Sequence, residues 1–340
     1  MSFKRINNIT GWIVCIIACA VYIMTMEATG SLWDCGEFAS SAYKLQIPHP
    51  PGAPLFVLIG RLFMVPFDAA HAATGINLMS ALASGFTILF LFWSITHFAR
   101  KLVTKDGAEL TNEKIYGLMA AGIVGALAYT FSDSFWYSAV EGEVYALSSF
   151  FTAVVFWGIL KWEQSVDAEQ KEGIKGHFTK ADSWIILIFY LMGLSIGVHL
   201  LNLLTIPAIV MIYYYKRYEK ITKMGTFWAF LIGCGITGLV QKAVVVWTIK
   251  GAGNFDILFV NSFGLPYYSG FVFFFIFIGF LIFFGLKIAS KRNWNFLKLG
   301  LWSFVFMLLG YSTYFTTLVR SSADPSVDMF NVDNPVSLVG

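Results

Sequence analysis

The sequence predicts an all-α polytopic membrane protein, on three observations. The chain is 57% hydrophobic and 18% aromatic but only 13% charged, whereas soluble domains are about one quarter charged. Its apolar runs recur at about the length that crosses a hydrocarbon core of about 30 Å. Each run is expected to be helical, because lipid offers no hydrogen-bond partner to backbone groups and the alternation typical of a membrane barrel is missing.

The apolar runs predict about nine membrane spans. They lie near residues 10–28, 75–99, 116–132, 144–160, 184–199, 202–215, 226–248, 269–286 and 299–318. The first is expected to be an uncleaved helix, because no small-residue cleavage site follows it. The pair 184–199 and 202–215 allows a second interpretation, in which the two runs form one long tilted helix.

The short run 54–67 is expected to be an interfacial or re-entrant helix, because about 14 residues are too few for a span and the run carries Arg61. With this run left out, the N-terminus and the loops 100–114, 161–182, 216–223 and 287–298 share one side. They hold 18 of the 23 Lys and Arg residues, which marks that side as cytoplasmic. The opposite side then receives the acids Asp34, Glu37, Asp68, Asp133, Glu141, Glu143, Asp256, Asp324, Asp328 and Asp333.

The first external loop, 29–74, contains the most informative stretch, SLWDCGEFASSAYKLQIPHPPGAP at 31–54. Ser31 and Asp34 have the spacing of a capping box, so a short interfacial helix is expected to begin at Ser31 and to end before Pro48. Asp34 and Glu37 would share one face near its positive N-terminal end. An ionised carboxylate beside a hydroxyl group has the chemistry of a general base.

The alternative for Asp34 and Glu37 is that they are ordinary solvated loop acids. Two features favour a site. Gly36 permits close approach of another backbone or a ligand, and the HPPG turn at 49–52 fixes the returning chain. His49, which opens that turn, is a candidate substrate-binding residue. Trp33 and Phe38 are expected to anchor the helix at the membrane interface.

The cysteines predict neither a disulfide framework nor a metal site. Cys15 and Cys19 lie in the first span, Cys234 lies in another, and Cys35 stands alone in the external loop. This spacing fits no set of metal ligands. We therefore interpret all four as structural residues and expect no metal ligands among them.

Further binding candidates lie on the predicted external side. Arg320 is expected to bind a phosphate through its guanidinium group, with a snorkelling helix-end residue as the alternative. His199 and Asn202 are a second polar pair, the alternative being a packing histidine. Glu141 and Glu143 beside Tyr145 are typical of a sugar site, although an aromatic belt with acids at a helix N-terminus would look the same.

Several of these segments resemble one family of membrane glycosyltransferases. WDCGEF at 33–38 and HPPGAPLF at 49–56 are similar to the signature of glycosyltransferase family 117, a protein O-mannosyltransferase-like family of the GT-C superfamily, in its bacterial-type form. EGEVY at 141–145, GVHLLNLL at 197–204, VRSSADPSVD at 319–328 and DNPVSL at 333–338 are similar to later segments of that family. The resemblance implies a GT-C-like transmembrane catalytic domain over 1–320. Residues 321–340 are then expected to begin an external polar segment that is cut short.

The resemblance also implies an activity. A mannose-like hexose would pass from a polyprenyl-phosphate donor to a hydroxyl group, in the favoured case Ser or Thr of an exported protein, with inversion and with Asp34 as the general base. The expected location is the external face of the plasma (inner) membrane. The expected partners are membrane lipid, the lipid-linked sugar and the protein acceptor, without nucleic acid. No cofactor is implied beyond the donor, and a requirement for a divalent metal is left open.

Two alternatives come from other classes of protein. A lipid or solute transporter or flippase would share this composition, but is expected to show two matching halves with charges buried near the membrane midplane. The polar residues here gather at one face instead. A purely structural membrane subunit would not explain the spacing of WDCGEF and HPPG.

Overall fold

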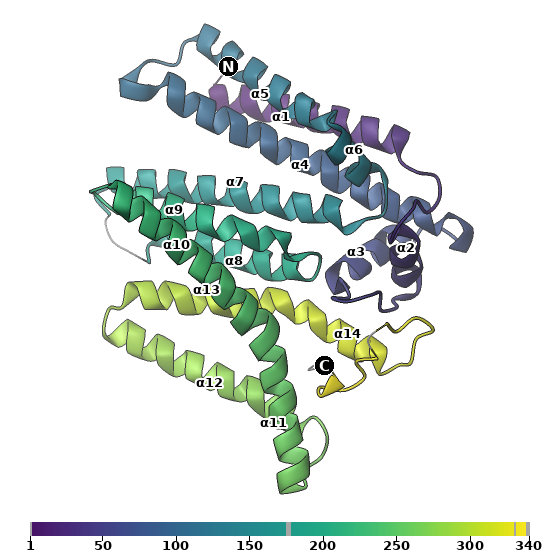
Figure 1. Cartoon of the computed structure of the whole chain (residues 1–340). Coiled ribbons are helices and arrows are strands. Elements are labelled where there is room, and N and C mark those ends of the chain that lie inside the picture. The colour runs from purple at the N-terminus through teal and green to yellow at the C-terminus, as the bar shows by residue number, and fades with distance from the viewer. Residues whose placement is uncertain (1, 175–177, 330, 338–340) are drawn as a thin grey trace. The chain divides into compact units, whose positions relative to one another are not determined.

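The structure is a computed structural model that describes residues 2–174, 178–329 and 331–337. Its regular structure is helical (Figure 1), and the one β pairing among these residues is a parallel bridge between Ile47 and Asp328. The predicted all-α class is therefore confirmed. The chain divides into unit 1, Met1–Leu45 with Phe56–Leu160, and unit 2, Gln46–Leu55 with Lys161–Gly340.

Unit 1 is built around α4. Its elements are α1 (Phe3–Thr25), α2 (Cys35–Lys44), α3 (Pro54–Met64), η1 (Ala69–His71), α4 (Ala72–Val103), η2 (Lys105–Gly107), α5 (Asn112–Thr130), α6 (Asp133–Val140) and the first part of α7 (Val144–Lys171). Helices α1 and α5 run along α4 (Figure 1). Tyr22 of α1 is fully buried and donates its hydroxyl hydrogen to the carbonyl oxygen of Thr130 at 2.9 Å.

A short helix is present within the predicted loop, although it begins later than expected and its external, interfacial position stays a prediction. α2 starts at Cys35 rather than Ser31, because Trp33 adopts a left-handed backbone conformation with φ 60° that a right-handed helix cannot contain. Phe38 is not an interfacial anchor: it is 4% exposed, and its ring lies 5.1 Å from that of Phe56. α3 has 11 residues, too few for a span, as expected of the run 54–67.

Unit 2 continues from α7 with η3 (Lys180–Asp182), α8 (Ser183–Ile196), η4 (Leu200–Thr205), α9 (Ile206–Arg217), α10 (Lys223–Val240), the π-helical η5 (Gln241–Trp247), α11 (Thr248–Phe263), α12 (Ser269–Lys291), α13 (Asn295–Tyr311), η6 (Ser312–Tyr314) and α14 (Phe315–Ser321). α8 packs on α13, α9 on α10, and α12 on both α11 and α13. The 184–215 region is thus two helices separated by η4, rather than one.

The α8–α13 crossing depends on two glycines. A Cβ atom on Gly193 would lie 3.0 Å from the backbone nitrogen of Tyr311, and one on Gly310 would lie 2.6 Å from that of Leu194. Small residues at such crossings let the backbones of membrane helices approach each other closely. The backbones of the two helices are therefore in direct contact at this crossing.

Asp256 joins α11 to α12. It is 2% exposed, although the sequence placed it in an external loop. Its Oδ1 accepts hydrogen bonds from the backbone N–H groups of Gly270 at 3.1 Å and Phe271 at 3.3 Å, and its Oδ2 accepts one from Tyr268 at 3.3 Å. These N–H groups at the start of a helix have no intrahelical partner, so Asp256 caps α12 from the neighbouring helix.

Among the described residues, six helical segments are long and apolar enough to cross a membrane, or seven if α5 and α6, bent by 67°, count as one span. The nine predicted spans are not confirmed, because α8 and α9 have only 14 and 12 residues and α10, η5 and α11 form one helical stretch over Lys223–Phe263. Of the predicted loop 161–182, residues 175–177 lie outside the described residues. So do residues 330 and 338–340 of the predicted terminal segment.

Candidate functional site

The segment that follows α1 is fixed to two other parts of unit 1. The backbone N–H of Glu27 donates to the carbonyl oxygen of Val140 at the end of α6, at 2.9 Å. The side-chain amide of Asn77 on α4 donates to the carbonyl oxygens of Glu27 and Thr29, at 2.8 and 3.1 Å. Asn77 is 1% exposed, so these bonds are made in a buried place. The path of the chain toward Asp34 is therefore set by α4 and α6.

Asp34 and Glu37 stand together at the start of α2. Asp34 occupies the N-cap position but makes no side-chain capping bond, and Glu37 lies in the first turn. A carboxylate oxygen of one lies within 4.8 Å of a carboxylate oxygen of the other. Asp34 is exposed and Glu37 is partly buried. The two acids share the positive end of α2 as predicted, and this end stabilises negative charge.

Glu141 and Glu143 lie in the turn between α6 and α7. Glu143 is 6% exposed. Its Oε1 lies 3.8 Å from the Sγ atom of Cys35, and its Oε2 accepts the backbone N–H of Val144 at 3.3 Å. Burial raises the pKa of Glu143, and the nearby charges of Asp34 and Glu141 raise it further. The structure thus brings Glu143 beside the Asp34 segment.

Tyr145 and Cys35 complete this part of unit 1. Tyr145, in the first turn of α7, is 49% exposed, whereas Cys35 is 2% exposed. Burial raises the pKa of the Cys35 thiol to about 12, helped by the charges of Glu141 and Glu143. The thiol is therefore protonated at neutral pH and can donate its S–H. Sequence reasoning treated Cys35 only as a structural residue, since its partner lies 108 positions away.

Two carboxylates as close as those of Asp34 and Glu37 are also oxygen ligands of the kind that hard divalent cations prefer. The Glu143 carboxylate is less suited to that role, because both of its oxygens already have hydrogen-bond donors. Within unit 1 the Asp34–Glu37 pair is therefore better suited to hold a metal than Glu143, and removal of metal with EDTA tests this.

In unit 2 the residues on either side of the turn that begins at His49 are hydrogen-bonded to two other segments that carry candidate site residues. Gly52, at φ 87°, donates its N–H to the His49 carbonyl oxygen at 2.8 Å and closes the turn. The N–H of Leu55 donates to the carbonyl oxygen of Gly197 at 2.8 Å, and that of Ile47 to Val327 at 3.0 Å. These bonds join the HPPG turn to the chain next to His199 and to the segment after Arg320.

His199 and Asn202 lie at η4. His199 accepts the backbone N–H of Leu201 on Nδ1 at 3.2 Å, and burial lowers the pKa of its ring. Asn202 is fully buried, and neither the oxygen nor the nitrogen of its side-chain amide has a hydrogen-bond partner among the described residues. An amide left unpaired in the interior costs about 1–3 kcal/mol, which an ordered water or a ligand group would offset.

Arg320 lies in the last turn of α14 and is partly buried. The next residue, Ser321, donates to the Oδ2 of Asp328 at 2.5 Å, which folds the following chain back on the helix. Asp328 also forms the parallel bridge with Ile47. The segment that follows Arg320 is therefore attached both to the end of α14 and to Ile47.

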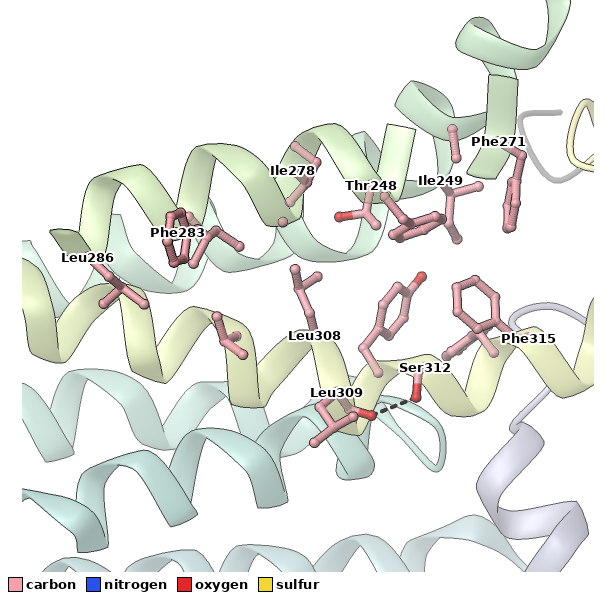
Figure 2. Close-up of a pocket in the computed structure, with 17 residues that line it drawn as sticks. Thr248, Ile249, Phe271, Ile278, Phe283, Leu286, Leu308, Leu309, Ser312 and Phe315 are labelled. Atoms are coloured by element: carbon pink, nitrogen blue, oxygen red, sulfur yellow. Dashed lines mark hydrogen bonds between the residues drawn. The ribbon is translucent and has the colours of Figure 1, made fainter. Parts of the chain in front are cut away.

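A cavity of about 490 Å³ lies between α11, α12 and the α13–η6–α14 stretch (Figure 2). Most of its wall is aliphatic or aromatic, including Phe271, Phe283 and Phe315. Two lining hydroxyl groups are already used: Tyr311 donates to the Val245 carbonyl oxygen at 3.2 Å, and Ser312 to that of Leu309 at 2.7 Å. The cavity therefore suits a hydrocarbon chain better than a polar ligand.

This cavity was missed by sequence reasoning. The signal available was the phenylalanine-rich run of α12, but the same run is typical of a helix that faces lipid. Phe315 on the cavity wall and Arg320 lie five residues apart along α14, a rise of roughly 7.5 Å. One end of the cavity, at Phe315, is thus formed by the same short helix that carries Arg320, the candidate phosphate-binding residue.

Comparisons with known proteins support one family. The family described as protein O-mannosyl-transferase TMEM260 N-terminal domain matches residues 34–222. The protein O-mannosyl-transferase tmem260 of Dictyostelium discoideum is 27% identical over 221 residues, which cover 61% of this chain and 23% of that protein. The mouse protein O-mannosyl-transferase TMEM260 is 25% identical over 155 residues, 46% of this chain and 20% of its own length.

The match thus spans less than a quarter of the length of either relative. No solved structure matches the chain. The family match begins at Asp34 and includes α2, the α6–α7 turn and η4, so it covers most of the segments described above. Since it extends over more than half of the sequence, the chain belongs to the protein O-mannosyl-transferase TMEM260 N-terminal domain family.

Proposed function

We propose that this chain is a membrane glycosyltransferase of the GT-C type that mannosylates protein hydroxyl groups. The observation that carries the proposal is the Asp34–Glu37 pair, whose oxygens lie within 4.8 Å at the start of α2, in a chain of this family. The Dictyostelium discoideum and mouse relatives described above are both named protein O-mannosyl-transferases. The proposed donor is a polyprenyl-phosphate-linked, mannose-like hexose, and the proposed acceptor is Ser or Thr of an exported protein.

In the proposed reaction Asp34 is the general base. Its carboxylate takes the proton of the acceptor hydroxyl while the oxygen attacks the anomeric carbon. The bond between that carbon and the phosphate oxygen breaks, and the polyprenyl phosphate leaves with the electron pair. The anomeric configuration is inverted, and the proton on Asp34 is then released to water. Such base catalysis contributes about 10²–10⁴-fold to the rate.

The exposure of Asp34 and the N-terminal end of α2 support this role. An exposed carboxylate is accessible to an acceptor, and Asp34 lies at the N-terminal end of α2, the positive end of the helix dipole. Glu37, one turn further and partly buried, is proposed to orient the acceptor hydroxyl. Glu141 and Tyr145 are proposed to bind the sugar, with the Tyr145 ring against the apolar face of the pyranose.

The donor is proposed to be held by residues of unit 2. Arg320 would bind the phosphate through two parallel hydrogen bonds, with His49, His199 and Asn202 as further polar contacts. The apolar cavity beside Phe315 would accept part of the polyprenyl chain, which supports a lipid-linked donor over a water-soluble nucleotide sugar. The concentration of basic residues in the loops on the other side supports a site on the non-cytoplasmic face.

The test is transfer by the purified protein in detergent. Polyprenyl-phosphate mannose, polyprenyl-phosphate glucose and a nucleotide-linked mannose would each be supplied with a Ser/Thr-rich peptide. The expected product carries mannose on a hydroxyl side chain, in the anomeric configuration opposite to that of the donor, and only with the lipid donor. Absence of transfer from every lipid donor, or retention of configuration, would overturn the proposal.

A further inference from the structure

We infer that Glu143 is a positioning residue that acts through the Cys35 thiol to hold the first turn of α2, and with it the Asp34 carboxylate, in the geometry for proton removal. This inference rests on the proposed function, in which Asp34 is the base. It gives Glu143 a role different from binding the sugar, and it gives Cys35 a role in the site.

The contact between the two side chains is enclosed. Cys35 is 2% exposed and Glu143 is 6% exposed, and the Sγ and Oε1 atoms are 3.8 Å apart. The second carboxylate oxygen accepts the N–H of Val144, which fixes the side chain against the start of α7. A carboxyl group with both oxygens engaged and almost no exposed surface is poorly placed to meet a sugar. It is well placed to hold a neighbouring helix.

A second attachment lies at the other end of the same segment. Glu27 is hydrogen-bonded to Val140 at 2.9 Å, so residues 27–35 are held at both ends by residues 140–143 of the α6–α7 region. Asp34 is directly next to the Cys35 attachment. Loss of the Glu143 contact would keep the hydrogen bonds at Glu27, Ala28 and Thr29 but would remove the link between Cys35 and the start of α7, next to the base.

The charges around Glu143 support a holding role. The titratable groups that face it are Cys35, Asp34 and Glu141. Burial and the two acidic neighbours raise the pKa of Glu143, so its carboxyl group is less suited than that of the exposed Asp34 to act as an ionised general base. The Cys35 thiol is protonated, so it can donate to the Glu143 oxygen.

The kinetic test compares truncating and conservative variants. Glu143→Ala and Cys35→Ala are expected to lower kcat about 10–100-fold, since displacement of a reacting group by about 1 Å costs up to about 10²-fold, and to leave the KM for donor unchanged. Glu143→Gln and Cys35→Ser keep an acceptor and a donor at these positions and are expected to retain kcat within about threefold. The double variant Glu143→Ala/Cys35→Ala is expected to be no slower than either single variant, because both remove the same contact.

Several outcomes would overturn the inference. An inactive Glu143→Gln that still folds would make Glu143 a proton-transferring residue, and a raised donor KM in Glu143→Ala would make it a binding residue. Additive losses in the double variant would separate the two side chains. If Glu143→Ala does not fold, Glu143→Asp, which shortens the side chain by one methylene, provides the same comparison. The matched control is Glu109→Ala, because Glu109 is an exposed carboxylate on the surface of unit 1.

A labelling experiment separates this inference from the proposed function. The alkylation rate of Cys35 by N-ethylmaleimide, followed by mass spectrometry of its peptide, is expected to rise at least tenfold in Glu143→Ala and to be unchanged in Glu109→Ala. An unchanged rate in Glu143→Ala refutes the contact. A protein that transfers no sugar but still shows the increase refutes the proposed function and leaves the contact between Cys35 and Glu143 established.

Discussion

The side-chain amide of Asn77 lies 2.8 Å from the carbonyl oxygen of Glu27, which places the second turn of α4 against the loop that leads to Asp34. Asn77→Asp removes both amide donors without leaving a cavity, and it sets carboxylate oxygens against two carbonyl oxygens. We expect a loss of about 1–3 kcal/mol in the free energy of unfolding, because buried acceptors are left unpaired, together with lower transfer activity. Melting in detergent and initial transfer rates measure the two effects.

Asn77→Ser is the companion variant for this prediction. It can restore one of the two hydrogen bonds, so it is expected to lie between the wild type and Asn77→Asp in both measurements. Wild-type activity in a folded Asn77→Asp protein would show that the position of the loop does not matter for transfer.

The second prediction separates the two acids on α2. Asp34→Asn keeps the size of the side chain but cannot accept a proton at neutral pH, so it is expected to reduce kcat by about 10²–10⁴-fold with donor binding retained. Glu37→Gln is expected to leave measurable activity, because it keeps an acceptor for the hydroxyl group. Rates for both variants, with donor binding measured separately, test this assignment; the reverse pattern would exchange the two roles.

The third prediction concerns metal dependence. Since Asp34 and Glu37 are proposed to act as base and orienting group, dialysis against EDTA is expected to leave the wild-type transfer rate unchanged. A rate that disappears with EDTA and returns with Mg²⁺ or Mn²⁺ would instead make the pair on α2 metal ligands.

The fourth prediction concerns the donor phosphate. Arg320→Lys keeps the positive charge but loses the planar pair of donors that matches a phosphate, so the KM for the lipid donor is expected to rise about tenfold while the KM for the peptide stays constant. Arg61→Lys is the matched control, because Arg61 lies over the ring of Tyr43 at 5.1 Å and is not among the residues proposed to hold the donor. Equal effects in the two variants would argue against a phosphate at Arg320.

The fifth prediction is a pH dependence of stability. Burial lowers the pKa of His199 in the folded protein, so the unfolded chain binds the proton more readily. The contribution of His199 is therefore complete above the unfolded pKa of about 6.5 and is lost as the pH falls toward the folded pKa. The melting temperature is expected to drop between pH 7.5 and pH 5, and this drop is expected to be smaller in His199→Gln. Parallel pH profiles for the two proteins would rule out His199 as a source.

Sequence reasoning found the class of the fold and the acids of the first loop, because composition and local motifs carry both. It placed the start of α2 at Ser31, since a capping box can be read locally, whereas the left-handed Trp33 that delays the helix cannot. It placed Asp256 in an external loop because the residue falls between the predicted spans 226–248 and 269–286, whereas the structure buries it in α11. The bonds that offset this cost come from the N-terminus of α12 and depend on tertiary packing.

The same limit explains what was missed at the candidate site. Asn77 carries no motif, and the groups it binds lie about 50 positions earlier in the chain. Cys35 and Glu143 were both noticed but not connected, because nothing within either segment indicates the other. Motifs indicated the residues proposed to carry the chemistry, while the contacts that hold them in place arise from the packing of unit 1.

The close crossing of α8 and α13 has a consequence for the effect of mutations. Neither Gly193 nor Gly310 carries a functional group, yet an added methyl group at either position would meet backbone atoms that cannot move without separating the two helices. Missense alleles that place alanine there would therefore lower the stability of the protein, and they would be rescued by lower growth temperature more readily than any allele of Asp34. A genetic screen would then find these two glycines as readily as it would find the acids on α2.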